Sequence, residues 1–252
     1  MSTVKLTIAD GRAELVLDRP PVNVLDIAMM GEMCEALAEA SEVPDLRVLV
    51  ISAAGKAFSA GVDVGEHMGD MAPKMLRAFN GLIADILDFP LPTVALVKGM
   101  ALGGGCEVTL ACDLVLASEK ASLGQPEVKV GVYPPPAVLL LPDLIGPRRA
   151  SDLMLTGRIL GAEEAREFGL VNHVFTLEEY DEKAEEIIAG LTSLSGTVLR
   201  KSIEVLRSGD SFREAAENLG EHYLEELMPT RDAQEGLTAF LEKRKPEWTH
   251  GE

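Results

Sequence analysis

The alternation of short apolar runs with helical patterns is the feature that most constrains what this chain can fold into. The runs at 46–53 and 91–99 are short and continuously apolar, which is typical of strands buried on both faces of a sheet. Helical spacing of apolar residues separates such runs, at 23–42 and 71–88. Mostly helical patterns follow from residue 147 onward. This order predicts an α/β fold that ends in a helical region.

Turn and capping signals place the remaining elements. Asp10 and Gly11 interrupt an alternating apolar pattern at 4–20, which predicts a hairpin. Either Asn23 or Asp26 is suited to cap the helix that follows. In the second half we expect a short strand at 170–175 and helices at 147–156, 162–168, 178–190, 197–207, 212–227 and 231–243.

The charge balance limits the classes of partner. A net charge of −18, from 41 acidic and 23 basic residues, argues against nucleic acid, because a phosphate backbone needs a basic surface. No apolar run approaches the ~20 residues that cross a bilayer, and the first residues lack a signal-peptide pattern. The three cysteines show no C-x-x-C spacing. We therefore expect a cytoplasmic protein with reduced thiols and no membrane partner.

A glycine-rich turn at 103–105 follows one of the predicted strands. Glycines let the backbone approach a ligand closely, and the helix after them directs free N–H groups toward the same point. Glu107 lies in the first turn of that helix, where a carboxylate also suits the helix dipole without any further role. The segment is neither a dinucleotide fingerprint, since Val108 stands at the third glycine position, nor a P-loop.

A second loop of small residues, 56–64, also follows a strand. It approaches the nucleophile-elbow pattern, but Ala57 replaces the first glycine and Ser59 comes after several loop residues. We interpret it as another loop that exposes amides to a ligand. Glu127, in a turn-rich segment, is a solvated loop residue if it stands alone. Together with Glu107 and the two loops it completes the parts for acid–base chemistry beside an oxyanion site.

The remaining polar groups predict no metal centre. The four histidines, His67, His173, His222 and His250, lack metal-ligand spacing. His67 follows the second small-residue loop, where it either lines a pocket or is exposed. Three consecutive prolines at 134–136 lack N–H groups and have a fixed φ, which predicts a stiff segment a few residues beyond Glu127.

Several motifs together resemble the enoyl-CoA hydratase/isomerase (crotonase) superfamily over nearly the whole chain. They are DRPPVN at 18–23, AFSAGVDV at 57–64, ALGGGCEVTLACD at 101–113, LGQPEVKVGV at 123–132, LTGRILGAEEAREFGLVNHVF at 155–175 and AFLEKRKPEW at 239–248. The resemblance implies a spiral of ββα repeats over 1–195. It implies a helical region over 196–252 that drives assembly of a homotrimer or a dimer of trimers. The implied substrate is an acyl-CoA, with no separate cofactor.

The resemblance also implies roles for particular residues. Glu107 and Glu127 match the two catalytic glutamates of the hydratases, and the amides of Ala60 and Gly104 match the oxyanion-hole donors. The residues expected to contact CoA are Ala60, Gly61, Val62, Asp63, Phe240 and Lys243, and those expected in the pocket wall are His67, Tyr133 and Pro135. Hydration then uses Glu107 to deprotonate water and Glu127 to protonate the α-carbon.

One departure from the family pattern is Pro135, which stands where the hydratases have a glycine whose amide helps to hold water. The chain is similar to the cyclohexa-1,5-diene-1-carbonyl-CoA hydratases in its EHM at 66–68, its LDFPLP at 87–92 and its proline-bearing loop. A stiff loop that shapes a flat cavity for a ring is consistent with that subgroup. The alternatives are an enoyl-CoA isomerase, a non-catalytic acyl-CoA-binding trimer and, more remotely, a serine hydrolase.

Overall fold

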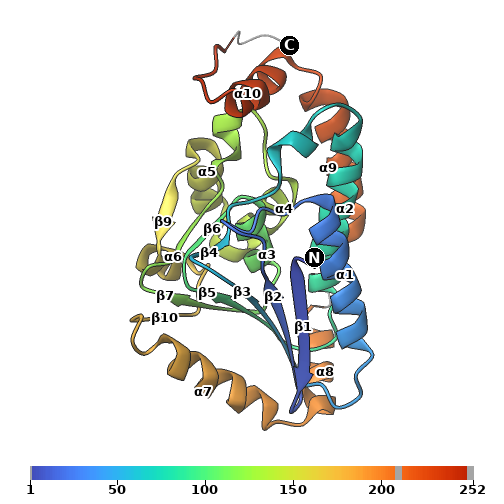
Figure 1. The fold of residues 1–252 in the computed structure, drawn as a ribbon, viewed down its shortest axis with the longest axis vertical. Helices are drawn as coiled ribbons and strands as arrows, with labels where there is room; N and C mark the ends of the chain where they lie inside the picture. The colour runs from blue at the N-terminus through green and yellow to red at the C-terminus, as the bar shows by residue number, and fades with distance from the viewer. Residues whose placement is uncertain (1, 208–211, 249–252) are drawn as a thin grey trace.

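Two β-sheets form the centre of the protein in a computed structural model that describes residues 2–207 and 212–248 (Figure 1). The larger sheet has the strand order β1-β2-β3-β5-β7-β10, and only its β1–β2 pair is antiparallel. The smaller sheet has the order β4-β6-β8-β9, and only its β8–β9 pair is antiparallel. The strands are β1 Val4–Ala9, β2 Arg12–Leu17, β3 Val48–Ala53, β4 Ala57–Ser59, β5 Thr93–Val97, β6 Met100–Leu102, β7 Leu114–Ser118, β8 Ser122–Gly124, β9 Ile159–Gly161 and β10 His173–Phe175.

The strands and helices repeat as ββα units. In the units β3-β4-α2, β5-β6-α3 and β7-β8-α4, the first strand joins the larger sheet and the second joins the smaller one. The predicted spiral of ββα repeats is thereby confirmed. The helices are α1 Ile27–Ser41, α2 Ala72–Leu87, α3 Gly104–Leu110, α4 Pro135–Ile145, α5 Pro147–Thr156, α6 Ala162–Phe168, α7 Tyr180–Thr192, α8 Gly196–Leu206, α9 Phe212–His222 and α10 Arg231–Leu241. Short helical turns span Val64–His67, Gly69–Met71, Pro126–Val130 and, as a π-helical turn, Tyr223–Leu227.

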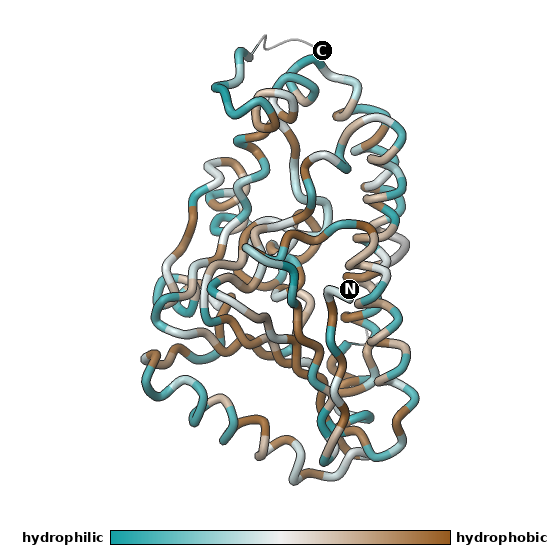
Figure 2. Tube along the Cα trace, in the orientation of Figure 1, coloured by the Kyte–Doolittle hydropathy of each residue, from teal (hydrophilic) through white to brown (hydrophobic). Residues whose placement is uncertain are grey.

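The apolar runs in the strands are buried on both faces of the larger sheet, as expected. In β3, Leu49 and Ile51 belong to the core under α1 and α2, while Val48 and Val50 face the side chains of α7. Figure 1 shows α7 below the sheet and α1 and α2 beside its other face, and Figure 2 shows the strands as predominantly hydrophobic. Burial on both faces explains why these strands lack a polar alternation.

Local signals set the ends of the early elements. Asp10 and Gly11 both have positive φ in the β1–β2 turn, as the hairpin prediction requires. Asp26, rather than Asn23, caps α1, because its Oδ1 accepts a hydrogen bond from the Met29 amide at 2.8 Å.

The three prolines were expected to form a stiff loop, and this expectation is wrong in part. Pro134 precedes α4, and Pro135 and Pro136 are its first two residues. Proline is favoured there, because the first helical N–H groups have no intrahelical acceptor and its φ is already helical. The smaller sheet was also not predicted, since its three-residue strands are too short to show a period.

A third group of buried apolar residues links the two halves of the chain near α10. Ala72 and Leu76 from α2 pack with Val132, with Tyr223 and with Leu237 of α10. No helix among residues 2–207 and 212–248 is long and apolar enough to cross a membrane. The division at residue 195 stays a prediction.

Candidate active site

A cavity of about 390 Å³ lies where the loops after β4, β6 and β8 meet α2, α4 and α10. This volume falls within the usual range for small-molecule sites. Ten of the twelve residues predicted for the site line it: Ala60, Gly61, Val62, His67, Gly104, Glu107, Glu127, Tyr133, Pro135 and Phe240. The other two, Asp63 and Lys243, are not among its lining residues. The loops that follow strands of the smaller sheet therefore converge as the sequence led us to expect.

Glu107 projects from the first turn of α3 and is almost fully buried. Its Oε1 accepts a hydrogen bond from the amide of Ala137 at 2.8 Å. Ala137 is the third residue of α4, so its N–H is one of those that a helix leaves without an internal acceptor. The prolines at the start of α4 thus bring a helix N-terminus onto this carboxylate.

Glu127 lies in the helical turn after β8, with its carboxylate against the glycine-rich loop. A Cβ atom on Gly103 would lie 2.5 Å from Glu127 Oε1, and Gly103 has a φ of +52°. Glycine is required there both by the backbone conformation and by the carboxylate. With its amide nitrogen turned toward Glu127, the buried Gln125 side chain donates to both carboxylate oxygens at 3.2 Å.

The two carboxylates titrate far from their usual range. Burial raises the pKa of Glu107 well above its ordinary value, and the nearby charge of Glu127 raises it further, while the Ala137 hydrogen bond opposes both. Burial raises the pKa of Glu127 to about 8, against a lowering contribution from its own backbone N–H. The pair therefore holds at least one proton at neutral pH, which is the condition for one member to act as an acid.

The backbone donors in the cavity differ from those expected. The Ala60 amide donates to the Val22 carbonyl at 2.9 Å, so it has no hydrogen left for a substrate oxygen. Leu25 bonds the Gly61 carbonyl and the Asp63 amide, each at 2.9 Å, and the intervening Val62 N–H therefore points the other way along the extended chain. This corrects the assignment of Ala60 as a donor.

The amides of Val62 and Gly104 are the free donors at this point of the cavity. Gly104 is the first residue of α3, and neither amide donates to another group in the part of the chain that the structure describes. A Cβ atom on Gly104 would lie 2.5 Å from Val62 Cγ2, so the two residues are in direct contact. They form a donor pair beside the two carboxylates.

Ser59 supports this loop and is not placed as a nucleophile. It is fully buried, and its hydroxyl donates to the Asn23 carbonyl at 2.7 Å and accepts from the Gly61 amide at 3.2 Å. The Asn23 side chain in turn donates to the carbonyls of Ala54 and Ala57 at 3.0 and 2.9 Å. The DRPPVN motif thus braces the loop that presents Val62.

Two residues of the EHM motif have different roles: Glu66 supports a helix end, and His67 lines the cavity. Glu66 accepts from the Ile27 amide at 2.9 Å and so completes the N-terminus of α1. His67 lines the cavity, where its Nδ1 donates to the Asp63 carbonyl at 2.9 Å. Burial lowers the pKa of His67, which keeps the ring neutral at neutral pH. The Asp63 side chain accepts from the Gly65 amide, so it caps the turn that carries His67.

The last predicted binding residues lie at the edge of the cavity or beyond it. Phe240 lines the cavity from α10 while more than half of its surface stays exposed. Lys243 follows α10 as an exposed residue with a φ of +56°. Among residues 2–207 and 212–248, no cluster of three or more potential ligands is arranged to hold a metal ion, and His250 lies outside the described residues.

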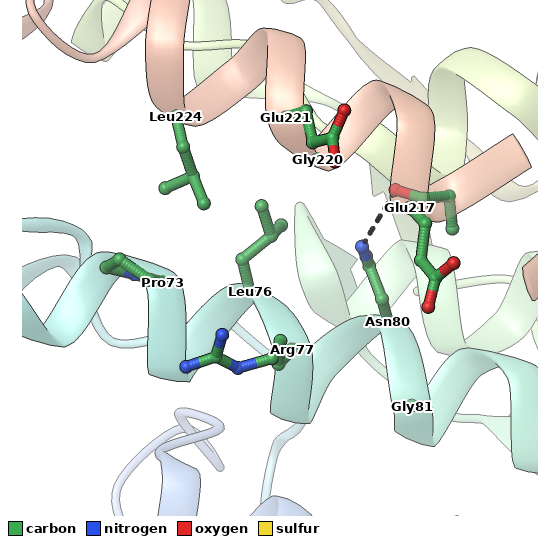
Figure 3. A pocket seen from close by; sticks show the side chains of 10 residues that line it. Pro73, Leu76, Arg77, Asn80, Gly81, Glu217, Gly220, Glu221 and Leu224 are labelled. Atoms are coloured by element: carbon green, nitrogen blue, oxygen red, sulfur yellow. Dashed lines mark hydrogen bonds between the residues drawn. The ribbon is translucent and has the colours of Figure 1, made fainter. Parts of the chain in front are cut away.

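A larger cavity, of about 610 Å³, lies between α2 and α9 (Figure 3). Asn80 spans it at one end by donating to the Ala216 carbonyl at 3.5 Å. Its charged side chains, Arg77, Glu217 and Glu221, are exposed on the helix surfaces. Functional acids and bases usually have shifted pKa values, so the cavity that holds Glu107 and Glu127 is the candidate active site.

Several site residues were not expected from the sequence. Recognising Pro135 as a helix start would have predicted a free amide at Ala137. Gln125 stands two residues before Glu127, but nothing local indicates that its side chain turns toward that carboxylate. Tyr223 and Leu237 come from distant helices and enter the cavity only through the tertiary packing.

Comparisons with known proteins give a consistent result. A family model described as Enoyl-CoA hydratase/isomerase matches residues 7–251. The chain is 39% identical over 241 residues to a cyclohexa-1,5-dienecarbonyl-CoA hydratase of Thauera aromatica, covering 93% of this chain and 91% of that protein. It is 35% identical over 245 residues to a carnitinyl-CoA dehydratase of Salmonella typhi, covering 93% and 94%. The fold is similar to a crystal structure of an enoyl-CoA hydratase from Mycobacterium avium subsp. paratuberculosis K-10, with a TM-score of 0.86, 28% identity and 98% of each chain covered.

Proposed function

Because the chain belongs to the enoyl-CoA hydratase/isomerase (crotonase) family, we propose that it adds water across the double bond of an α,β-unsaturated acyl-CoA thioester. The observation that carries this proposal is that the buried Glu107 and the partly buried Glu127 line one cavity beside two free amides. Homologues with this chemistry are hydratases and dehydratases, which supports the assignment to the hydro-lyases.

The amides of Val62 and Gly104 hold the thioester oxygen in the proposed reaction. Attack of water on the β-carbon moves electron density onto that oxygen and creates an enolate. Preorganised N–H donors stabilise the developing charge, and loss of one such donor typically costs ~10²–10³ in rate. Because the loops are braced by Ser59 and Asn23, the donors need no rearrangement as the charge forms.

The two glutamates divide the proton transfers. Glu107 takes a proton from the attacking water while the water oxygen bonds to the β-carbon, and the Ala137 N–H favours the ionised form that this step needs. Glu127, whose pKa is raised to about 8, gives its proton to the α-carbon as the enolate collapses. Transfer of one proton from Glu107 to Glu127 then restores the starting state.

A double-bond isomerase is the second candidate. Pro134, Pro135 and Pro136 have no N–H, and the Ala137 N–H is already bonded to Glu107, so the start of α4 offers no donor to hold a water molecule. An isomerase needs a proton shuttle and no bound water. The presence of both glutamates favours hydration.

We propose a cyclic dienoyl-CoA as the substrate. The similarity to the hydratase of Thauera aromatica supports this, as does the stiff proline wall of the cavity. Three sequence features are shared with that subgroup. One of them, LDFPLP, has a structural role, because the carbonyl groups of Leu87 and Phe89 accept hydrogen bonds from the Arg207 side chain. His67 and the prolines are the features that reach the cavity. The homotrimer or dimer of trimers implied by the family, and CoA contacts by Phe240 and Lys243, stay proposals.

A panel of three thioesters tests the function. The purified protein is incubated with crotonyl-CoA, a 3-enoyl-CoA and cyclohexa-1,5-diene-1-carbonyl-CoA, and products are identified by mass. We expect the ring substrate to gain the mass of one water with the highest kcat/KM. A 3-enoyl-CoA converted to its 2-enoyl isomer, with no hydration of the other two thioesters, would instead identify an isomerase.

A further inference from the structure

We propose that Tyr133, held in place by His222 and Glu226, is a specificity-determining residue that selects a planar ring as the acyl group. This inference rests on the proposed acyl-CoA chemistry and extends it to the residues that recognise the ring. It starts from an aromatic corner in the cavity, formed by Tyr133 and Tyr223.

The two rings of the corner are perpendicular. Tyr133 directly precedes the prolines of α4, whereas Tyr223 follows α9, and both line the cavity. Their centroids are 5.3 Å apart with an interplanar angle of 89°. Aromatic rings prefer offset-stacked or edge-to-face contacts at centroid distances of about 4.5–7 Å. A flat ring seated in this corner is therefore able to stack on one tyrosine and meet the other edge to face.

A chain of hydrogen bonds fixes the position of Tyr133. Its hydroxyl lies 3.0 Å from His222 Nδ1, and His222 Nε2 lies 3.1 Å from Glu226 Oε2. The carboxylate of Glu226 favours the tautomer with hydrogen on Nε2, which leaves Nδ1 to accept from the phenol. Burial, together with the charge of Glu226, raises the pKa of Tyr133 to about 12, so the phenol remains a donor.

A π-helical turn brings these groups together. It spans Tyr223–Leu227 directly after α9, and it contains both Tyr223 and Glu226. Such turns are rare and occur frequently at functional sites. Here His222 and Tyr223 are consecutive, one bonding the hydroxyl of Tyr133 and the other packing on its ring. A linear acyl chain needs only apolar lining, so this arrangement favours a ring.

Binding of two unreactive thioesters tests the corner without turnover. Dissociation constants of benzoyl-CoA, which carries a planar ring, and butyryl-CoA are measured by titration calorimetry for the wild type and Tyr133→Leu. One lost aromatic contact predicts benzoyl-CoA binding that is weaker by about 3- to 10-fold, with butyryl-CoA binding changed less than about 2-fold. Equal weakening for both thioesters, or none, would overturn the inference.

A double-mutant cycle tests the positioning chain. We expect Tyr133→Phe and His222→Gln each to weaken benzoyl-CoA binding, and the double variant to lose no more than either single variant, because both break the same bond. Butyryl-CoA binding shows that each variant is folded. His173→Gln, at an exposed histidine in β10, is the matched control and should bind both thioesters like the wild type. Additive losses would contradict the positioning role.

The inference and the proposed function fail separately. If the wild type hydrates no thioester but its preference for benzoyl-CoA depends on Tyr133, the ring-selecting corner stands and the hydratase proposal falls. If it hydrates the ring substrate while Tyr133→Leu leaves the preference unchanged, the corner is overturned and the function stands.

Discussion

Glu107 and Glu127 owe their unusual titration to where the fold places two ordinary carboxyl groups. Both are removed from bulk water, and the charge on one disfavours ionisation of the other. Both carboxylates also accept hydrogen bonds, Glu107 from the Ala137 amide and Glu127 from the Gln125 side chain. The Ala137 N–H favours an ionised Glu107, whereas Glu127, with a pKa raised to about 8, keeps its proton at neutral pH. In the mechanism that we propose, Glu107 is therefore the base and Glu127 the acid.

We predict that Glu107→Gln and Glu127→Gln each slow turnover by ~10²–10⁴, the usual contribution of a positioned acid or base. The amide keeps the shape of the side chain but neither takes nor gives a proton in this pH range. Initial rates on the preferred thioester of the panel measure the effect. Glu178→Gln, an exposed glutamate before α7, is the matched control. A near-normal rate in either active-site variant would rule out the two-glutamate mechanism.

At the scale of elements, α4 begins at the three prolines, where the sequence predicted a stiff loop. Its first two residues are prolines that border the cavity or lie beside it, and its third amide holds Glu107. The helix is thus both a wall of the cavity and a support for Glu107, the proposed base. A rigid wall restricts the acyl groups that fit, since it cannot move away from a long chain.

We predict that Pro135→Gly raises kcat/KM for crotonyl-CoA relative to the ring thioester by several-fold. Glycine adds an N–H at a residue that lines the cavity, where we expect it to hold water, and it frees the first turn of α4 to move. Steady-state rates on both substrates give the ratio. Pro147→Gly alters the equivalent first position of α5, which does not line the cavity, and should leave the ratio unchanged. An unchanged ratio for Pro135→Gly would mean that the helix start does not set specificity.

At the scale of the whole molecule, the same carboxylates lower the stability of the folded state. A glutamate whose pKa is raised on folding binds its proton more tightly when folded than when unfolded. Below the ordinary pKa of 4.5, both states are protonated and no penalty arises. As the pH rises from 4.5 through about 8, the unfolded chain ionises freely and the folded protein is destabilised.

We predict that the double variant Glu107→Gln/Glu127→Gln loses less stability than the wild type between pH 5 and pH 8. The variant lacks these two carboxylates, so their contribution disappears from its free energy of unfolding. Urea unfolding at the two pH values provides the measurement. The midpoints are compared between proteins whose m-values are the same. Parallel changes in both proteins would show that the pair is not a source of the pH dependence.

The sequence by itself determined those features that depend on neighbouring residues. The Asp10-Gly11 turn and the apolar runs of β3 and β5 each act within a few positions, and the structure confirms them. The sequence offered Asn23 or Asp26 as the cap of α1, and the structure selects Asp26. The family and its ββα spiral were also predicted correctly, because several motifs occur together in one order. The convergence of Glu107, Glu127 and the two loops on one cavity followed from that family pattern.

Only the tertiary structure decided which groups meet across long separations. The Ala60 amide is bonded to Val22 and is therefore not the free donor, which its own loop sequence does not reveal. Ala137 reaches Glu107 across 30 residues, and His222 reaches Tyr133 across 89. Such contacts depend on how helices pack rather than on local propensity. For this reason the sequence predicted most of the residues that line the site, while packing decided which amides are free and what shapes its wall.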